Sequence, residues 1–194
     1  MLKILRPFTI LDAEKTLSGR SRRIQRMPCA CRVPFELYPE ASEWGPLLWK
    51  VLHGLAERSG RPTTPMYGED ERRAWITLFK STGDIIPCPT CKEHFLDYFK
   101  EHSIDELKTL PLSQLHDWVR DWFWTAHNWV NETLGKPEFS KEELAATYAS
   151  VNLRAALAEL DVPMKRAIVL SGYNQKKFAD WRSKVFMLFS ILGV

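Results

Sequence analysis

The sequence lacks the features that define several large classes of protein. None of its apolar runs comes near the roughly 20 residues that a membrane-spanning helix needs, and the longest candidate is the C-terminal stretch Val185 to Val194. There are only four cysteines in 194 residues, and there is no internal repeat or low-complexity segment. These absences exclude an integral membrane protein, a disulfide-dense miniprotein and a collagen-like fibre.

The composition instead indicates a folded globular protein of one domain, or of one domain and a tail. Hydrophobic residues make up 45% of the chain and charged residues 26%, which is typical of such a protein. Eight Trp and ten Phe are many for this length, and they can fill a core or wall a pocket for a flat ligand. Strand patterns are scarce and helical spacing dominates, which predicts an all-α fold.

Six helices are predicted from apolar spacing, caps and breakers, and the short loops between them favour a compact helical bundle. The first is expected to begin after a Ser42 cap, with Pro46 in its first turn. The third is expected to begin at Cys88, with Pro89 at its first position. Their predicted ranges are 43–57, 70–80, 88–101, 112–135, 141–160 and 175–191.

The charge is unevenly distributed along the chain. Residues 1–32 carry eight Lys or Arg against Asp12 and Glu14, a net charge of +6, whereas the remaining residues sum to −3. The basic arm is interpreted as a solvated tail, with an organelle-targeting segment and weak nucleic-acid contact as alternatives. We expect no nucleic-acid partner for the body of the protein.

The four cysteines form two pairs, Cys29–Cys31 and Cys88–Cys91, and two kinds of site compete for them. Four thiolates can hold a structural zinc ion. Alternatively, each pair can cycle between dithiol and disulfide. The second pair favours redox chemistry, because a cysteine at a helix N-terminus is stabilised as a thiolate by unpaired amides and the helix dipole.

Polar groups and tryptophans gather near the end of the fourth predicted helix. His127 and Asn131 are four residues apart and so share a face, while Asn128 shares a face with Trp124. Lys136 follows in a Gly-Lys-Pro run. A satisfied polar patch beside the core is one explanation. The other is a flat heteroaromatic ligand that bears phosphates. The indoles would stack on its ring, the amides would form hydrogen bonds with the edge of the ring, and the lysine would neutralise a phosphate.

A matching stripe on the first predicted helix places Gly45, Trp49 and His53 at four-residue spacing. Together, these segments resemble the Erv/ALR family of FAD-linked sulfhydryl oxidases. The resemblance covers about residues 43–150 and rests on WKVLH (49–53), PCPTC (87–91) with Phe95, HNWVN (127–131), LGKP (134–137) and Phe139.

The resemblance implies an all-α four-helix bundle with an additional short helix, plus an extra C-terminal helix. Residues 1–40 would be the arm, 41–158 the FAD-binding domain and 159–194 a C-terminal helical extension. It also implies a homodimer. The residues expected to contact FAD are Gly45, Trp49, His53, Cys91, His127, Asn128, Val130, Asn131, Leu134, Lys136 and Tyr148.

The resemblance further implies a relay of electrons. A protein dithiol, with a thioredoxin-like carrier as one candidate, would reduce a shuttle disulfide Cys29–Cys31, which would exchange with Cys88–Cys91. Cys88 would be the exchanging sulfur and Cys91 would lie against the isoalloxazine. FAD would pass the electrons to oxygen and give hydrogen peroxide, with no metal involved.

The chain departs from the family pattern at one pair of positions. Many members join the fourth helix to the segment after LGKP by a disulfide, but Trp124 and Lys141 occupy those places here. We expect the bulk of Trp124 to replace the bridge by packing. Such versions resemble members from large DNA viruses, which predicts the host cytoplasm or the virion, with the mitochondrial intermembrane space as the alternative.

Two other classes of protein stay open at this point. A zinc-stabilised, non-enzymatic helical adaptor would use both cysteine pairs for one metal. A thioredoxin-like reductase would use Cys-Pro-x-Cys, but its fold needs strands alternating with helices.

Overall fold

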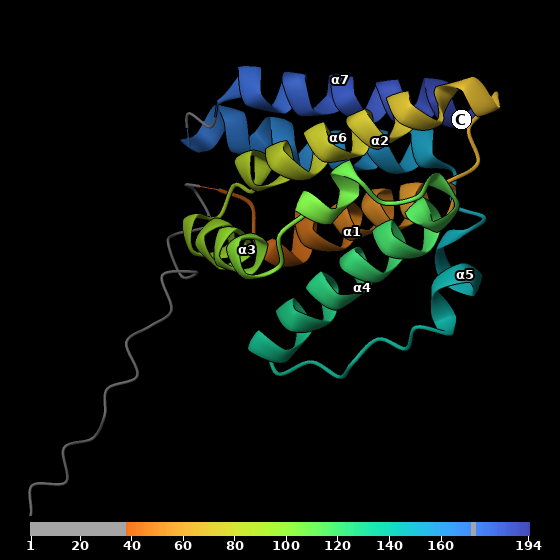
Figure 1. The fold of residues 1–194 in the computed structure, drawn as a ribbon. Coiled ribbons are helices and arrows are strands. Elements are labelled where there is room, and N and C mark those ends of the chain that lie inside the picture. The colour runs from red at the N-terminus through yellow and green to blue at the C-terminus, as the bar shows by residue number, and fades with distance from the viewer. Residues whose placement is uncertain (1–37, 172–173) are drawn as a thin grey trace, which may run out of the picture.

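The structure is a computed structural model, and it describes residues 38–171 and 174–194. These residues form seven α-helices and no β-strand, so the predicted all-α fold is confirmed (Figure 1). None of the helices in these two ranges is both long and apolar enough to cross a membrane. The helices are α1 (Ala41–Ala56), α2 (Gly68–Thr82), α3 (Pro89–Glu101), α4 (Leu115–Thr133), α5 (Glu143–Tyr148), α6 (Leu153–Ser171) and α7 (Gln175–Leu192).

Helix α1 is the central element of the fold. Apolar side chains recur along it at three- and four-residue steps, and Leu48, Val51, Leu52 and Leu55 are all buried. It packs against α6 on one side and α4 on the other, as Figure 1 shows. A helix buried along so much of its surface is a rigid support for the side chains that it carries.

The start of α1 differs from the prediction. Glu40, and not Ser42, is the N-cap, and the helix begins at Ala41. Glu40 and Glu43 form a reciprocal capping box, in which each side chain accepts the other residue's backbone N–H. The helix therefore begins two residues earlier than expected, and Pro46 lies in its second turn.

The single helix predicted over 141–160 is wrong. The chain forms α5 there, breaks over residues 149–152, and begins α6 at Leu153. The Asn152 side chain accepts the Ala155 N–H at 3.1 Å, so this asparagine caps α6 and does not continue α5. Because α6 runs on to Ser171, the bundle is followed by two C-terminal helices where one was predicted.

These last two helices are part of the same core. Helix α6 lies along α1 and α7 lies along α2. Trp181 of α7 is completely buried, and its indole N–H donates to the Thr82 hydroxyl at 3.2 Å. Asp161 of α6 pairs with Arg182 of α7 at 3.0 Å. The domain boundary predicted at 158 falls inside α6, and the residues on either side of it contribute to one core.

Candidate functional site

The cysteines of the PCPTC run lie at the N-terminus of α3 and form a disulfide. Cys88 is the N-cap and Pro89 the first helical residue, as the sequence predicts. The Cys88 sulfur accepts the Cys91 N–H at 3.2 Å. Cys88 is only 1% exposed, whereas Cys91 is half-buried. When the bond is reduced, the helix N-terminus is therefore placed to stabilise a thiolate on Cys88.

Four ring side chains from three helices meet in one cluster: Trp49 and His53 of α1, His127 of α4 and Tyr148 of α5. Trp49 stacks on His127 with ring centroids 4.4 Å apart, and His53 stacks on Tyr148 at 4.6 Å. Nε2 of His53 lies 3.0 Å from Nδ1 of His127, so one hydrogen bond joins the two imidazoles. We call these four residues the ring cluster. All four were predicted from the sequence to face one ligand.

Both imidazoles of the ring cluster are held neutral. Burial, with smaller contributions from His127 and Arg120, lowers the pKa of His53 to about 3. Burial and the Lys136 ammonium group lower the pKa of His127 to about 4. Nδ1 of His53 is buried and has no hydrogen-bond partner among the residues that the structure describes. Such an orphaned nitrogen fits a site where a ligand supplies the missing partner.

A charged pair supports α1 one turn beyond the ring cluster. The Arg120 Nε–H donates to Glu57 Oε1 at 2.6 Å, and the two side chains are 21% and 6% exposed. This pair is not among the site residues predicted from the sequence. Glu57 lies four residues after His53, which is a usable signal for a shared helix face. Its partner lies 63 residues further on, and only the fold brings the two together.

The LGKP run ends α4 and turns the chain back over it. Gly135 has a positive φ of 65°, a conformation that glycine adopts readily. Its N–H bonds to the Glu132 carbonyl at 3.0 Å, and the Lys136 N–H bonds to the Asn131 carbonyl at 2.8 Å. This is a Schellman ending, so the predicted stop at Gly135 has the expected geometry.

Asn128 holds the returning chain through its side-chain amide. Its Nδ2 donates to the Phe139 carbonyl at 3.0 Å, and its Oδ1 accepts the Phe139 N–H at 2.8 Å. Asn131 Nδ2 also donates to Asn128 Oδ1, at 3.3 Å. These bonds place the Phe139 ring at the edge of the ring cluster. Its centroid lies 6.2 Å from that of the His127 ring and 5.8 Å from that of the Tyr148 ring. The direct contact of Asn128 with a cofactor stays a prediction, and its observed role is to position Phe139.

The two residues that stand in place of the family disulfide hold the same segment. The Trp124 indole N–H donates to the Phe139 carbonyl at 2.8 Å. The Lys141 ammonium group lies 5.7 Å from the Trp124 ring centroid and 2.7 Å from Asp121 Oδ1. We call Trp124, Lys141 and Asp121 the α4 clamp. The clamp thus uses a hydrogen bond, a cation–π contact and an ion pair as well as the bulk expected of Trp124.

The remaining residues that were expected to contact FAD differ in how far they are exposed. A Cβ placed on Gly45 would meet no atom within 4 Å beyond its own helix and chain neighbours, so there is open space beside α1. Val130 is half-buried, Lys136 is exposed and Leu134 is 59% exposed. The predicted shuttle pair, residues 29 and 31, lies outside the described residues.

A cavity of about 530 Å³ lies between α3, α4 and the segment after LGKP. Asn128 and Lys136 line it, together with Tyr98 and Trp129. Within residues 38–171 and 174–194, no three His, Cys, Asp or Glu side chains converge to hold a metal ion. The zinc adaptor needs residues 29 and 31, which lie outside these ranges, and the thioredoxin fold needs strands, of which the described residues form none.

Comparison with known proteins agrees with the resemblance to the Erv/ALR family. The model described as the Erv1 / Alr family matches residues 46–149. The protein named FAD-linked sulfhydryl oxidase ERV1 of Oryza sativa subsp. japonica is 27% identical over 132 residues, which are 68% of this chain and 57% of the rice protein. The mitochondrial FAD-linked sulfhydryl oxidase ERV1 of Saccharomyces cerevisiae is 28% identical over 102 residues, 52% of this chain and 48% of the yeast protein.

Large DNA viruses also contain relatives. A putative FAD-linked sulfhydryl oxidase of Invertebrate iridescent virus 3 is 28% identical over 105 residues, 54% of this chain and 65% of the viral protein. The matches therefore span less than two thirds of the rice, yeast and viral proteins. No solved structure matches the chain.

Proposed function

Since the chain belongs to the Erv1/Alr family, we propose that it is an FAD-linked thiol oxidase that converts a protein dithiol into a disulfide. One observation carries the proposal: the same helical domain holds a disulfide at a helix N-terminus and a cluster of stacked rings. The disulfide is a reactive redox group, and the rings suit a flat cofactor.

The residues present fit FAD. The ring cluster offers aromatic faces, and the orphaned Nδ1 of buried His53 awaits a hydrogen-bond partner. The open space beside Gly45 leaves room for close approach to α1, and exposed Lys136 is available to neutralise a phosphate. When bound, FAD would supply the acceptor for the two electrons of a dithiol and transfer them to oxygen, giving hydrogen peroxide.

The chemistry of the chain itself is thiol–disulfide exchange. A substrate thiolate attacks one sulfur of the Cys88–Cys91 bond, which breaks as a mixed disulfide forms. The second substrate thiol then attacks the mixed disulfide. The substrate leaves oxidised, and Cys88 and Cys91 are left as a dithiol that has gained two electrons and two protons. Cys88 is assigned as the exchanging sulfur, and since it is 1% exposed, the start of α3 has to open for that attack.

Partners and location follow from the same proposal. We infer that Cys29–Cys31 delivers electrons from the substrate protein, or from a thioredoxin-like carrier, to Cys88–Cys91. Homodimer formation stays a prediction, and a second copy would have to use surfaces other than those that α6 and α7 cover on α1 and α2. The viral relatives are compatible with the host cytoplasm or the virion as the location, and the yeast relative, which is named mitochondrial, is compatible with the alternative of the mitochondrial intermembrane space.

Oxygen consumption with dithiothreitol, and separately with a reduced protein, tests this function. The native chain should consume oxygen with both, and Cys91→Ser should consume it with neither. Replacing both Cys29 and Cys31 by Ser should spare the small dithiol and slow the protein substrate. A native chain that binds no added FAD, or a Cys91→Ser chain as active as the native one, would refute the proposal. Equal loss on both substrates in the double variant would refute the shuttle alone.

A further inference from the structure

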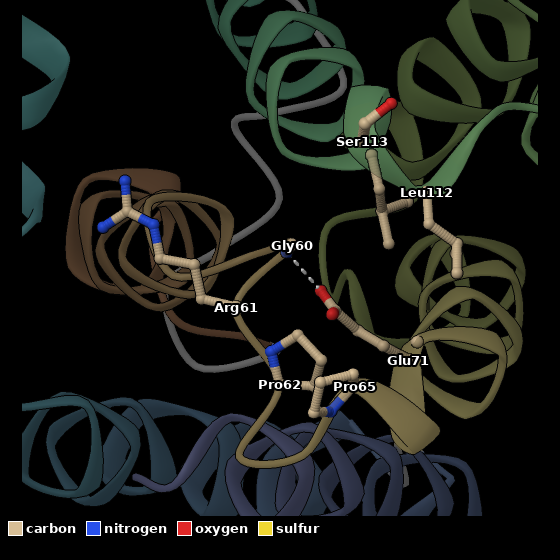
Figure 2. A pocket seen from close by; sticks show the side chains of 9 residues that line it. Gly60, Arg61, Pro62, Pro65, Glu71, Leu112 and Ser113 are labelled. Atoms are coloured by element: carbon tan, nitrogen blue, oxygen red, sulfur yellow. Dashed lines mark hydrogen bonds between the residues drawn. The ribbon is translucent and has the colours of Figure 1, made fainter.

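A second cavity, of about 390 Å³, lies where α2 begins, whereas the disulfide follows the end of α2. The loop after α1, the first turn of α2 and the residues before α4 form its walls (Figure 2). Its lining is largely apolar, with Pro62, Pro65, Leu112 and Leu115 among the contributors. One ionisable side chain of α2, Glu71, lies among them, and Figure 2 shows its carboxyl group directed toward Gly60.

Glu71 is completely buried, and one of its oxygens explains how the fold tolerates this. Its Oε1 accepts three hydrogen bonds, from the Ser59 hydroxyl at 3.0 Å, the Gly60 N–H at 2.7 Å and the Trp75 indole N–H at 3.1 Å. These bonds tie the chain after α1 to α2. All three donors are neutral groups, so they solvate the carboxyl group without balancing a charge on it.

The other oxygen of Glu71 has no such support. Oε2 is buried and accepts no hydrogen bond from any residue that the structure describes. A buried acidic side chain is rare unless a cation pairs with it, because an unpaired buried charge is costly. The nearest candidate in the cavity wall is Arg61, but this residue is exposed and its guanidinium group points away from Glu71 in Figure 2.

We propose that this cavity binds a guanidinium or primary ammonium group carried on a short apolar stem, with Glu71 Oε2 as its acceptor. The charged N–H group would supply both the hydrogen bond and the counter-charge that Oε2 lacks. The stem would lie against the prolines and leucines of the cavity wall, as lysine and arginine stems do on apolar surfaces. The proposed site shares no residue with the disulfide or the ring cluster, so it stands apart from the thiol oxidase proposal.

The test is a titration of the full chain with ethylguanidinium chloride, followed by the rise in melting temperature that a native-state ligand causes. Tetramethylammonium chloride at equal concentration controls for ionic strength, because it is a cation without an N–H group. Glu71→Gln keeps an amide oxygen for the three donors and removes the charge, and its affinity should fall by about tenfold or more. Glu69→Gln, an exposed acid two residues earlier in α2, should bind like the native chain.

A second variant keeps the test valid if Glu71→Gln does not fold. Ser113 is exposed at the cavity, and Ser113→Trp should fill the space without touching the three bonds of Glu71. Its binding of ethylguanidinium should be lost while the fold is kept. Flavin absorbance, read on the same samples, reports the proposed oxidase site separately.

Two sources of the ligand can be told apart in the same assay. If the blocked tripeptide Ala-Arg-Ala binds more tightly than ethylguanidinium, the natural ligand is an arginine side chain of a polypeptide. If it binds more weakly, the ligand is a small cation. The proposal is overturned if the native chain shows no saturable binding, or if Glu71→Gln binds equally well. Binding only after Arg61→Ala would also overturn it, because Arg61 would then be the native counter-ion.

Discussion

The α4 clamp is predicted to hold the segment 134–141 closed without a covalent bond. Trp124→Phe removes the indole N–H from the Phe139 carbonyl, which keeps a second donor in Asn128. That loss is worth about 0.5–1 kcal/mol. Lys141→Met removes an exposed cation–π contact and an exposed ion pair with Asp121, together worth about 0.5–1 kcal/mol. The double variant should therefore make opening of the segment easier by about 1–2 kcal/mol.

Amide hydrogen exchange measures this opening directly, because the Phe139 N–H is bonded to Asn128 Oδ1 only while the segment is closed. Its exchange should accelerate by about 5- to 30-fold in the double variant. The Leu78 amide, in the core of α2, should exchange at its native rate. Lys100→Met, which removes an exposed ion pair of α3, is the matched control and should leave Phe139 unchanged. An unchanged Phe139 rate in the double variant, or equal acceleration at Leu78, would refute the clamp.

Three further predictions concern stability and the ring cluster. Trp181→Ala should lower the free energy of unfolding by about 3–5 kcal/mol in urea, because α7 is part of the core. The fold lowers the pKa values of His53 and His127, so below about pH 6.5 the unfolded chain binds more protons than the folded chain. The free energy of unfolding should therefore fall as the pH falls towards 4, by up to about 1.4 kcal/mol per pH unit for each histidine. Constant stability over that range, by urea unfolding, would contradict the assignment. Arg120→Met should raise the pKa of His53, measured by NMR titration, and destabilise the chain by leaving Glu57 buried and unpaired.

Much of the fold follows from local chemistry that the sequence displays. The three- and four-residue spacing of Leu48, Val51, Leu52 and Leu55 predicts α1, and Gly135 with the lysine–proline pair predicts the end of α4. Residues 141–160 were predicted as one helix because helical spacing continues through them. The break depends on Asn152, whose side chain can cap a new helix as easily as it can interrupt an old one.

The candidate site was predictable where a motif displays it and hidden where distant contacts decide. Trp49, His53, His127 and Tyr148 were assigned to one ligand, and the structure brings these rings together. The contact of Asn128 with the same ligand stays a prediction, and the sequence gives no sign that its amide also holds the returning chain at Phe139.

The pairing of Arg120 with Glu57 and the contact of Lys141 with Trp124 depend on how helices and loops meet in space. Local spacing gives no account of such contacts. The unpaired oxygen of Glu71 is hidden for the same reason, since neither its three donors nor its cavity is visible in the sequence around it.

The visible absorbance of the flavin-loaded chain during an anaerobic dithiol titration tests most directly whether the Cys88–Cys91 disulfide passes electrons to FAD. The native chain should be yellow, dithiol should bleach it, and air should restore the colour. Cys91→Ser should bind FAD but resist bleaching, because the disulfide that passes the electrons on is absent. A native chain that binds no FAD, or equal bleaching in Cys91→Ser, would show that Cys88–Cys91 does not pass electrons to a bound flavin.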